Sequence, residues 1–277
     1  MDVEETATYY KYRSCSQRTW EILCNRELYF SLPKDLNDPL DVSVDVTAEY
    51  ERAKNHIYKT DKHPEGRKSF LITVLDSIRK VTRDTGEELS LSQALYRFMQ
   101  GRGILSLSKT SRDALLWSHY ADGHRGICLG FNAEILKIDG ASGSGDIQYL
   151  PSPPYMEKFL ELTEEFGEFC RPWDGVNFSD EQGTSFYNRQ VDAILQIGLY
   201  TKSESWKYEK EFRITSEPGN HAFSPSALVE VILGAKTSEA DEKKIKDFLS
   251  ADHYSHVRLK RAFNIPGTFS FGSRLLV

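Results

Sequence analysis

The last quarter of the chain opens with the stretch that decides the expected fold, Trp206-Lys207-Tyr208-Glu209-Lys210-Glu211-Phe212-Arg213-Ile214-Thr215. Residues 211–215 are predicted to form a β-strand that begins at a glutamate. If residues 209–214 are extended, Glu209 and Glu211 point to the same side, because side chains alternate along a strand. The stretch therefore predicts two carboxylates side by side at the start of a strand.

Further strands are expected on both sides of this stretch. They are predicted at residues 8–13, 28–31, 103–108, 126–131, 228–233, 256–263 and 268–277. Residues 126–131 are apolar on both alternating faces, which indicates a central strand that is covered on both sides. Strands at both ends of the chain with helices between them favour an α+β fold over a regular βαβ array.

The helices are expected mainly between the strands. Residues 46–100 have apolar side chains at helical spacing, for example Phe70, Val74, Ile78 and Val81, and predict a helical layer. Shorter helices are predicted after residues 14–16, from Ser111 as a candidate N-cap, and at 238–249. After a proline-rich break at 151–154, an acidic helix and a helix at 185–200 follow, whereas glycine-rich residues 140–145 predict a flexible turn. We expect one domain, residues 1–277, with helical insertions at about 46–100 and 151–200.

Composition limits the classes of function. The net charge of -6 gives no general attraction to nucleic acid, so any nucleic-acid contact needs a local basic groove. The four cysteines are scattered, lack the spacing of a zinc site or a redox dithiol, and are expected to be buried thiols. The sequence shows neither a signal segment nor a membrane span, so we expect a cytoplasmic protein without a membrane partner.

Common catalytic motifs are missing. Residues 140–145 lack the dinucleotide-binding spacing, and residues 234–237 lack the upstream glycine of a phosphate loop. His119 and His124 are five residues apart without the glutamate of a zinc protease, so no metal site is predicted there. There is no Gly-x-Ser-x-Gly nucleophile motif either.

Polar and aromatic residues instead gather at the ends of the predicted strands. They are Tyr10-Lys11-Tyr12-Arg13-Ser14, Leu28-Tyr29-Phe30-Ser31 with Asn37-Asp38-Pro39, Trp117-Ser118-His119-Tyr120-Ala121 with His124-Arg125-Gly126, and Lys202 with residues 206–213. On these residues the chain closely resembles a bacterial family known only as domain of unknown function twenty-nine seventy-one, which is related to the AbiGi type of abortive phage-resistance proteins. This resemblance identifies relatives and implies a setting in phage defence, but it implies no specific reaction.

A second resemblance, to ADP-ribosyltransferases of the DarT type, implies a reaction. A strand that ends in Arg13, a strand with Ser106 and Ser108, and a strand that begins at Glu211 are similar in order to the Arg-Ser-Glu plan of those enzymes. Glu209 adds the paired-glutamate spacing of members that modify arginine. The likeness implies a split β-sheet core and NAD as the substrate. The chain departs from the plan in two places, because Ser-Leu-Ser replaces the usual central threonine and Arg213 lies within the catalytic strand.

The resemblance gives each residue a role, and each role has a simpler alternative. Glu211 with Glu209 would be catalytic, or would form ion pairs with Lys207, Lys210 or Arg213. The cofactor-binding candidates are Tyr12, Arg13, Asn37, Ser106, Ser108, His119 and Tyr120. Arg13 would bind the pyrophosphate through its planar guanidinium, or would form an ordinary ion pair. His119 and Tyr120 would stack on a base or orient a ribose hydroxyl. Ser106 and Ser108 would shape the nicotinamide-ribose pocket or be ordinary strand hydroxyls, and Asn37 would hold a loop at the rim or be a turn residue.

Three functions follow as hypotheses. The first is an NAD-dependent ADP-ribosyltransferase or NAD glycohydrolase that modifies nucleic acid or protein, acting as a phage-defence effector or toxin with a neutralising antitoxin or immunity partner. The second is a metal-dependent nuclease that holds magnesium with Asp38, Asp41, Glu209 and Glu211. The third is a non-catalytic sensor or immunity module in which the same cleft recognises a nucleotide or a partner.

Overall fold

The computed structural model describes residues 7–42, 46–78, 80–82, 88–170 and 191–276. The chain divides into two compact units. Unit 1 contains Met1–Leu32, Arg102–Tyr149 and Glu204–Val277, and unit 2 contains Pro33–Gly101 and Leu150–Ser203. Both segments of unit 2 include a region that the sequence predicts to be a helical insertion.

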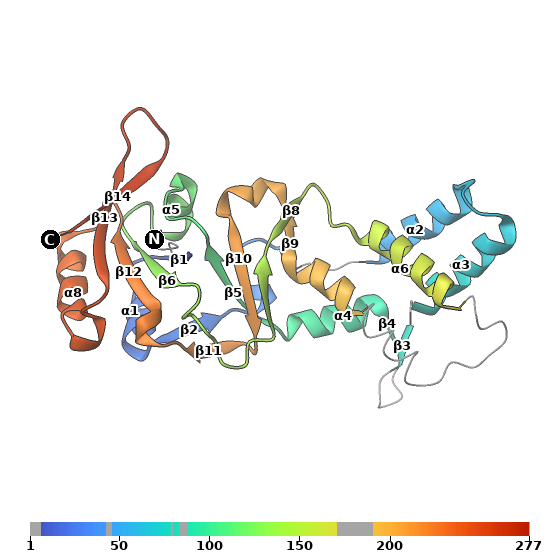
Figure 1. The fold of residues 1–277 in the computed structure, drawn as a ribbon, viewed down its shortest axis with the longest axis horizontal. Helices are drawn as coiled ribbons and strands as arrows, with labels where there is room; N and C mark the ends of the chain where they lie inside the picture. Colours follow the sequence, from blue (N-terminus) through green and yellow to red (C-terminus); the bar gives the residue numbers. More distant parts are fainter. Residues whose placement is uncertain (1–6, 43–45, 79, 83–87, 171–190, 277) are drawn as a thin grey trace, which may run out of the picture. The chain divides into compact units, whose positions relative to one another are not determined.

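Unit 1 is built on an eight-stranded mixed sheet (Figure 1). Its strand order is β14-β13-β12-β6-β1-β5-β10-β7, with β12 and β13 parallel and the other neighbours antiparallel. The bounds are β1 Thr8–Arg13, β5 Gly103–Ser108, β6 Ile127–Asn132, β7 Gly143–Asp146, β10 Glu211–Ser216, β12 Leu228–Leu233, β13 Arg258–Asn264 and β14 Phe271–Leu275. The α+β prediction is therefore confirmed.

The two faces of this sheet are covered differently. On one face, helices α1 (Gln17–Asn25) and α8 (Glu239–Leu249) pack with strand β2 (Glu27–Phe30) on one continuous apolar core, to which Leu129, Phe131 and Val231 belong. On the other face, helix α5 (Ala114–Tyr120) packs on a smaller apolar cluster. Its members are Tyr12, Leu116, Trp117, Ala121, Cys128, Ile232 and Ala262. We call these the α1/α8 face and the α5 face.

Strand β6 explains why both faces need cover. Ile127, Leu129 and Phe131 belong to the core of the α1/α8 face, whereas Cys128 belongs to the cluster under α5. The prediction of a central strand covered on both sides is confirmed. Helix α5 begins differently from the prediction, because the N-cap is Asp113 and not Ser111. The Asp113 carboxylate accepts the backbone N–H groups of Leu115 (2.8 Å) and Leu116 (3.2 Å).

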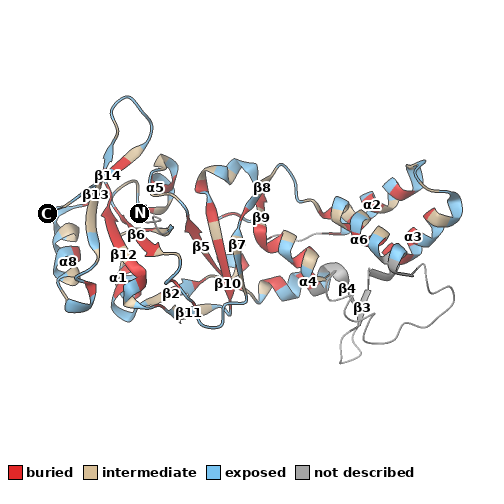
Figure 2. Cartoon of the chain, viewed as in Figure 1, coloured by how far each residue is buried: buried red, intermediate tan, exposed pale blue. Residues whose placement is uncertain are grey.

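Unit 2 is mainly helical. It contains η1 Pro33–Asp35, α2 Thr47–Lys59, α3 Glu65–Ile78, α4 Leu91–Gln100, α6 Tyr155–Cys170 and a helix over residues 191–200. Buried apolar residues of α2, α3 and α6 form its core (Figure 2). Tyr50 and Phe159 meet edge to face, with ring centroids 6.3 Å apart. Lys202 and Asp41, 3.4 Å apart, form a buried ion pair that joins the beginning and the end of this unit.

Several details of the expected secondary structure differ in the structure. Strands β3 (Lys80–Thr82) and β4 (Glu88–Ser90) interrupt the predicted helical layer, and Val81 lies in β3. The predicted turn at residues 140–145 is partly strand, because Gly143–Asp146 forms β7 at the edge of the sheet. Strand β11 (Gly219–Ala222), which pairs with β2, was not predicted. Short strands β8 (Gln148–Leu150) and β9 (Thr201–Ser203) complete the described strands.

Two further predictions concern thiols and membranes. Cys128 is buried as expected, but Cys15 is half-buried and Cys24 is exposed; the side chain of Cys170 lies outside the described residues. In the described part of the chain, no helix combines the length and the apolar character that crossing a membrane requires.

Candidate functional site

One row of residues crosses the α5 face from strand to strand. Paired Cα positions run from Glu230 to Gly130, then to Tyr10, Ser108 and Glu211. Residues that pair across neighbouring strands point to the same face, so two carboxylates, a phenol and a hydroxyl share this row. Gly130 leaves the space between them, because a Cβ there would lie 2.6 Å from Cγ of Glu230.

Glu211 occupies one end of this row and is held on two sides. It is the first residue of β10 and only 3% exposed. Its Oε1 accepts a hydrogen bond from Nε of the fully buried Arg213 (2.8 Å), and its backbone N–H donates to the Tyr149 hydroxyl (2.7 Å). The ion pair with Arg213, one of the simpler alternatives for this glutamate, is therefore present. A charge buried this deeply needs such a partner, since leaving it alone is very costly.

Glu209 reaches the same region by another route. It is the last residue of the 3₁₀ helix η3 (Glu204–Glu209), and Lys210 has a positive φ of 46°, so the extended segment begins only at Glu211. The expectation that both glutamates share one face of a continuous strand is wrong in its premise. Glu209 is nevertheless buried, with only 6% of its surface exposed. Its Oε1 accepts a hydrogen bond from the Tyr120 hydroxyl (2.6 Å), and its backbone carbonyl oxygen accepts one from Ser108 Oγ (2.6 Å).

Aromatic rings gather where α5 ends beside η3. The ring centroid of His119 lies 6.2 Å from that of Tyr120 and 6.4 Å from that of Tyr208, and Tyr208 lies 5.9 Å from Trp206. His119 is exposed, whereas Tyr120 is half-buried. These rings form a ledge beside the Glu209 carboxylate that suits stacking on a planar group.

The two serines of β5 are engaged differently. Ser108 Oγ donates to the Glu209 carbonyl and accepts from the backbone N–H of Thr110 (3.1 Å), so this hydroxyl links β5 to η3. Ser106 is half-buried and pairs with Arg213 across the sheet. Its carbonyl oxygen accepts from Lys11 Nζ (2.6 Å). Ser108 thus has a structural contact, and Ser106 lies on the face that carries Arg213.

Tyr12 supports the site from within the cluster under α5. Its ring meets the Trp117 indole edge to face, with centroids 5.1 Å apart, and its hydroxyl donates to the Thr110 carbonyl (2.9 Å). Burial, together with nearby Cys128 and Asp113, raises the pKa of Tyr12 far above its ordinary value. Tyr12 and the fully buried Trp117 are therefore core residues.

Arg13 does not join these residues. Tyr12 packs under α5, so the next side chain along β1 points to the opposite face, where Tyr9 packs on the α1/α8 core. Arg13 is half-buried there, and its Nε is a buried atom without a hydrogen-bond partner among the described residues. Burial and, second, the charge of Arg18 lower the pKa of Arg13. The structure does not bring Arg13 together with Glu211.

Asn37 lies in unit 2, exposed in the turn that follows η1. The neighbouring Asp38 carboxylate accepts the backbone N–H of Leu40 (2.9 Å), as expected of a turn residue. Lys202, one of the residues of the family resemblance, is buried against Asp41. In the described ranges, no group of three or more His, Cys, Asp or Glu side chains is arranged to hold a metal ion.

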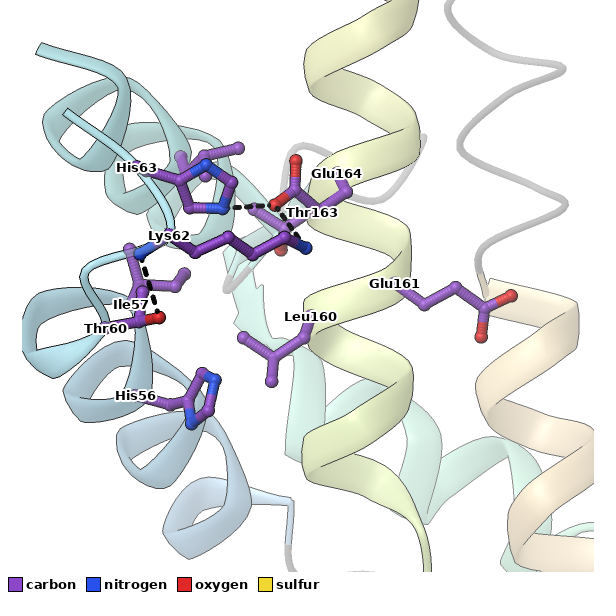
Figure 3. Close-up of a pocket in the computed structure, with 10 residues that line it drawn as sticks. His56, Ile57, Thr60, Lys62, His63, Leu160, Glu161, Thr163 and Glu164 are labelled. Atoms are coloured by element: carbon purple, nitrogen blue, oxygen red, sulfur yellow. Dashed lines mark hydrogen bonds and ion pairs between the residues drawn. The ribbon is translucent and has the colours of Figure 1, made fainter.

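Unit 2 contains a pocket of about 170 Å³ beside helices α2, α3 and α6 (Figure 3). Its charged groups already bind one another. Glu164 Oε1 lies 2.6 Å from His63 Nε2 and 3.8 Å from Lys62 Nζ, while Glu164 Oε2 lies 3.3 Å from Arg67 Nη2. The pocket therefore offers little uncompensated charge for a ligand.

Sequence reasoning missed three residues in and beside this row, which are Tyr10, Tyr149 and Glu230, whereas it had named Arg213 as a possible ion-pair partner. Glu230 binds the Tyr10 hydroxyl (3.1 Å), Lys260 Nζ (2.5 Å) and Arg258 Nη2 (3.2 Å). Burial and the Glu230 carboxylate raise the pKa of Tyr10 to about 12. A signal for Glu230 was present in the sequence, since it is the single charge inside the apolar strand Leu228–Leu233. A lone buried charge in such a strand requires partners.

Comparison with known proteins gives one family. The model described as "Protein of unknown function (DUF2971)" matches residues 116–214, so the family resemblance stated from the sequence is confirmed. The matched region contains Tyr120, Glu209, Glu211 and Arg213, whereas the residues before 116 lie outside it. The search of curated proteins and the search of solved structures each found no match.

Proposed function

We propose that this protein cleaves the bond between nicotinamide and ribose in NAD and transfers the ADP-ribose to an acceptor or to water. The observation that carries the proposal is the burial of two carboxylates, Glu209 and Glu211, beside Tyr120 and Ser108 on the α5 face. As nicotinamide leaves, positive charge develops on the ribose carbon. A carboxylate held in a water-poor site stabilises that charge, as in glycoside cleavage.

The arrangement of the strands supports the same proposal. Strands β1, β5 and β10 carry the three segments that are similar to the Arg-Ser-Glu plan, and they are neighbours in the sheet. Strands β1 and β5 pair only at Tyr10 and Ser108, and Lys11 Nζ bonds to the Ser106 carbonyl where a backbone donor would otherwise be expected. A sheet that opens between these strands fits the split core expected of an ADP-ribosyltransferase.

The contacts suggest separate roles for the two carboxylates. Glu211, fixed by Arg213 and Tyr149, would stabilise the cationic ribose, since a charge that is already oriented needs no rearrangement during the reaction. Glu209, which is bound by Tyr120 at the aromatic ledge, would orient or deprotonate the acceptor. Arg13 has no part in this proposal because it lies on the opposite face.

The biological setting rests on the family resemblance. We propose a bacterial cytoplasmic defence effector or toxin, with nucleic acid or protein as the acceptor and a neutralising antitoxin or immunity partner. Nothing in the contacts of the α5 face conflicts with this setting, and the partner would have to block access to Glu209 or Glu211.

Release of nicotinamide from NAD tests the proposal. Wild type is compared with Glu211→Gln and Glu209→Gln, each incubated with NAD in the presence of DNA, RNA and protein acceptors. Loss of about 3 kcal/mol of transition-state stabilisation slows turnover roughly a hundredfold. Glu230→Gln is the matched control, because Glu230 is equally buried and also paired with cations, but lies at the other end of the row. We expect this control to retain activity.

Two outcomes would overturn the proposal. If wild type binds NAD tightly but releases no nicotinamide with any acceptor, the protein is a sensor. If it instead cuts nucleic acid and loses that activity in chelator, it is a metal-dependent nuclease. Thermal unfolding of each variant separates loss of catalysis from loss of folding, because Glu211→Gln leaves the buried Arg213 without its anionic partner.

A further inference from the structure

Lys210 separates the two candidate carboxylates and has a backbone conformation that lysine seldom adopts. Its φ is 46°, in the left-handed region, where the Cβ of any residue other than glycine comes too close to the following carbonyl oxygen. Glycine adopts this conformation readily, and asparagine does so more often than most residues. A residue persists in such a conformation only where its surroundings fix it, and residues of this kind gather at functional sites.

Hydrogen bonds hold both sides of Lys210. Its backbone N–H donates to the Lys207 carbonyl (3.3 Å), which closes the last turn of η3. Its carbonyl oxygen accepts from the backbone N–H of Lys109 (3.0 Å), the residue that follows β5. One residue earlier, the Glu209 carbonyl accepts from Ser108 Oγ. The end of β5 therefore binds two consecutive carbonyl oxygens and fixes the turn between η3 and β10.

This turn changes the course of the chain within a single residue. Glu209 is the last residue of η3, whereas Glu211 is the first residue of β10 and pairs with Ser108. A left-handed residue just past a helix end is a common way for the chain to leave a helix, and glycine is the usual residue there. Here the turn at Lys210 leaves the carboxylates on either side of it buried on the α5 face.

A simpler role for Lys210 is to end η3 and nothing more. In that case the direction of the Glu209 side chain would not depend on residue 210. A substitution there would change stability but leave the hydrogen bond between Tyr120 and Glu209 intact. The two roles therefore make different predictions for the same variants.

We propose that the left-handed turn at Lys210 is a positioning device, which directs Glu209 onto Tyr120 while Glu211 begins β10. This inference rests on the proposed function and deepens it by naming a residue that acts through others. The side chain of Lys210 is exposed and dispensable, and the backbone conformation is what the site requires. Residues that tolerate a positive φ should therefore replace Lys210, and β-branched residues should not.

A double-mutant cycle in thermal unfolding tests the positioning without an assay of catalysis. Tyr120→Phe removes the donor to Glu209 and should lower the Tm of wild type by about 3 °C. The same change should lower the Tm equally in Lys210→Gly and Lys210→Asn. In Lys210→Val the additional loss should be less than half as large, because Glu209 no longer faces the phenol.

Two further variants complete the cycle. Lys207→Val is the matched control, since it places the same side chain on an exposed residue of η3 that lacks a positive φ. It should leave the effect of Tyr120→Phe unchanged. If Lys210→Val does not fold, Ser108→Ala takes its place, because it removes the hydroxyl that binds the Glu209 carbonyl and should weaken the same coupling.

Nicotinamide release then measures how far the reaction depends on this turn. Lys210→Gly and Lys210→Asn should retain most of the activity, although both remove the charge of the lysine. Lys210→Val should lower kcat about a hundredfold with little change in KM, because a displacement of about 1 Å at a reacting group has an effect of this size and the lost interaction is one made in the transition state.

Two results would overturn the inference. If Tyr120→Phe costs as much in Lys210→Val as in wild type, Glu209 keeps its contact without the turn. If nicotinamide release falls as far in Lys210→Asn as in Lys210→Val, the lysine side chain is required and the backbone conformation is not. The proposed enzyme fails separately: coupling without nicotinamide release from wild type refutes only the reaction, whereas nicotinamide release without coupling refutes only this inference.

Discussion

The two faces of the unit 1 sheet differ in how much apolar and how much charged surface they bury. On the α1/α8 face, residues from five strands and two helices form one apolar core. On the α5 face, the apolar cluster around Trp117 is smaller, and the row from Glu230 to Glu211 ends in buried charges. Burying an ion pair is often no better for stability than burying apolar groups of the same size. The α5 face therefore gives up stability that the other face keeps, as functional surfaces commonly do.

The largest change in the free energy of unfolding is expected when the buried cation of the α5 face, Arg213, is removed. Arg213→Met should lower the free energy of unfolding by about 3–5 kcal/mol, because Glu211 is left buried without its partner. The double variant Glu211→Leu/Arg213→Met should recover most of that loss in urea unfolding, yet have no nicotinamide-releasing activity. If the double variant is as unstable as the single one, the α5 face does not sacrifice stability for charge.

A second test uses neighbouring residues of β6 that point to opposite faces. Leu129 and Cys128 are both fully buried. Leu129→Ala should cost about 2–5 kcal/mol, because it opens a cavity in the larger core. Cys128→Ala removes a single heavy atom from the smaller cluster and should cost about 1 kcal/mol. Chemical denaturation measures the loss of stability in both variants. Equal losses would contradict the conclusion that the α1/α8 face contributes more apolar stabilisation than the α5 face.

A smaller effect is expected at the hydrogen bond between Tyr120 and Glu209. Tyr120→Phe removes the phenolic donor and should lower stability by about 1–2 kcal/mol, because the acceptor is a charged group. Nicotinamide release should fall more than stability does, since Glu209 loses its orientation. Leu115→Ala, an exposed position in the same helix, is the control. Unchanged activity in Tyr120→Phe would remove Tyr120 from the proposed site.

Long strands with a clear pattern could be predicted from the sequence, and short edge strands could not. Strands β1, β5 and β12 occupy the predicted residues, because their side chains are β-prone and none of them is exposed. Strand β7 reads Gly-Ser-Gly-Asp, which has no apolar alternation, and it forms only because β10 offers a free edge. Strand β11 reads Gly-Asn-His-Ala and depends in the same way on β2. Tertiary pairing decided these segments.

The candidate site could be predicted only where adjacent strands bring residues together. The order of the segments led to Ser108 and Glu211, which are paired positions. The contact between Tyr120 and Glu209 joins residues 89 apart in sequence, and no local pattern indicates it. Arg13 was assigned to the site from its place in the Arg-Ser-Glu order. Strand β1 carries large side chains on both faces, so its sequence does not reveal which face Arg13 uses. Only the register with β6 and β5 decides that.

The smallest effect is expected in the pH dependence of stability, through a histidine on the α5 face. His124 packs between Trp117 and Phe271 on the α5 face, and burial, with a second contribution from Lys236, lowers its pKa below the ordinary 6.5. Because the unfolded chain takes up this proton first, the stabilising contribution is present above pH 6.5 and is lost as the pH falls through the lowered pKa. Partial exposure leaves only a few tenths of a kcal/mol, so we expect the Tm to fall by about 1 °C more in wild type than in His124→Asn between pH 7 and pH 5. Asparagine is the suitable replacement, since His124 has a φ of 70° and asparagine tolerates that left-handed conformation. An identical pH dependence of the Tm in the two proteins would contradict a lowered pKa of His124. It would mean that solvent reaches the imidazole and that the α5 face does not bury it.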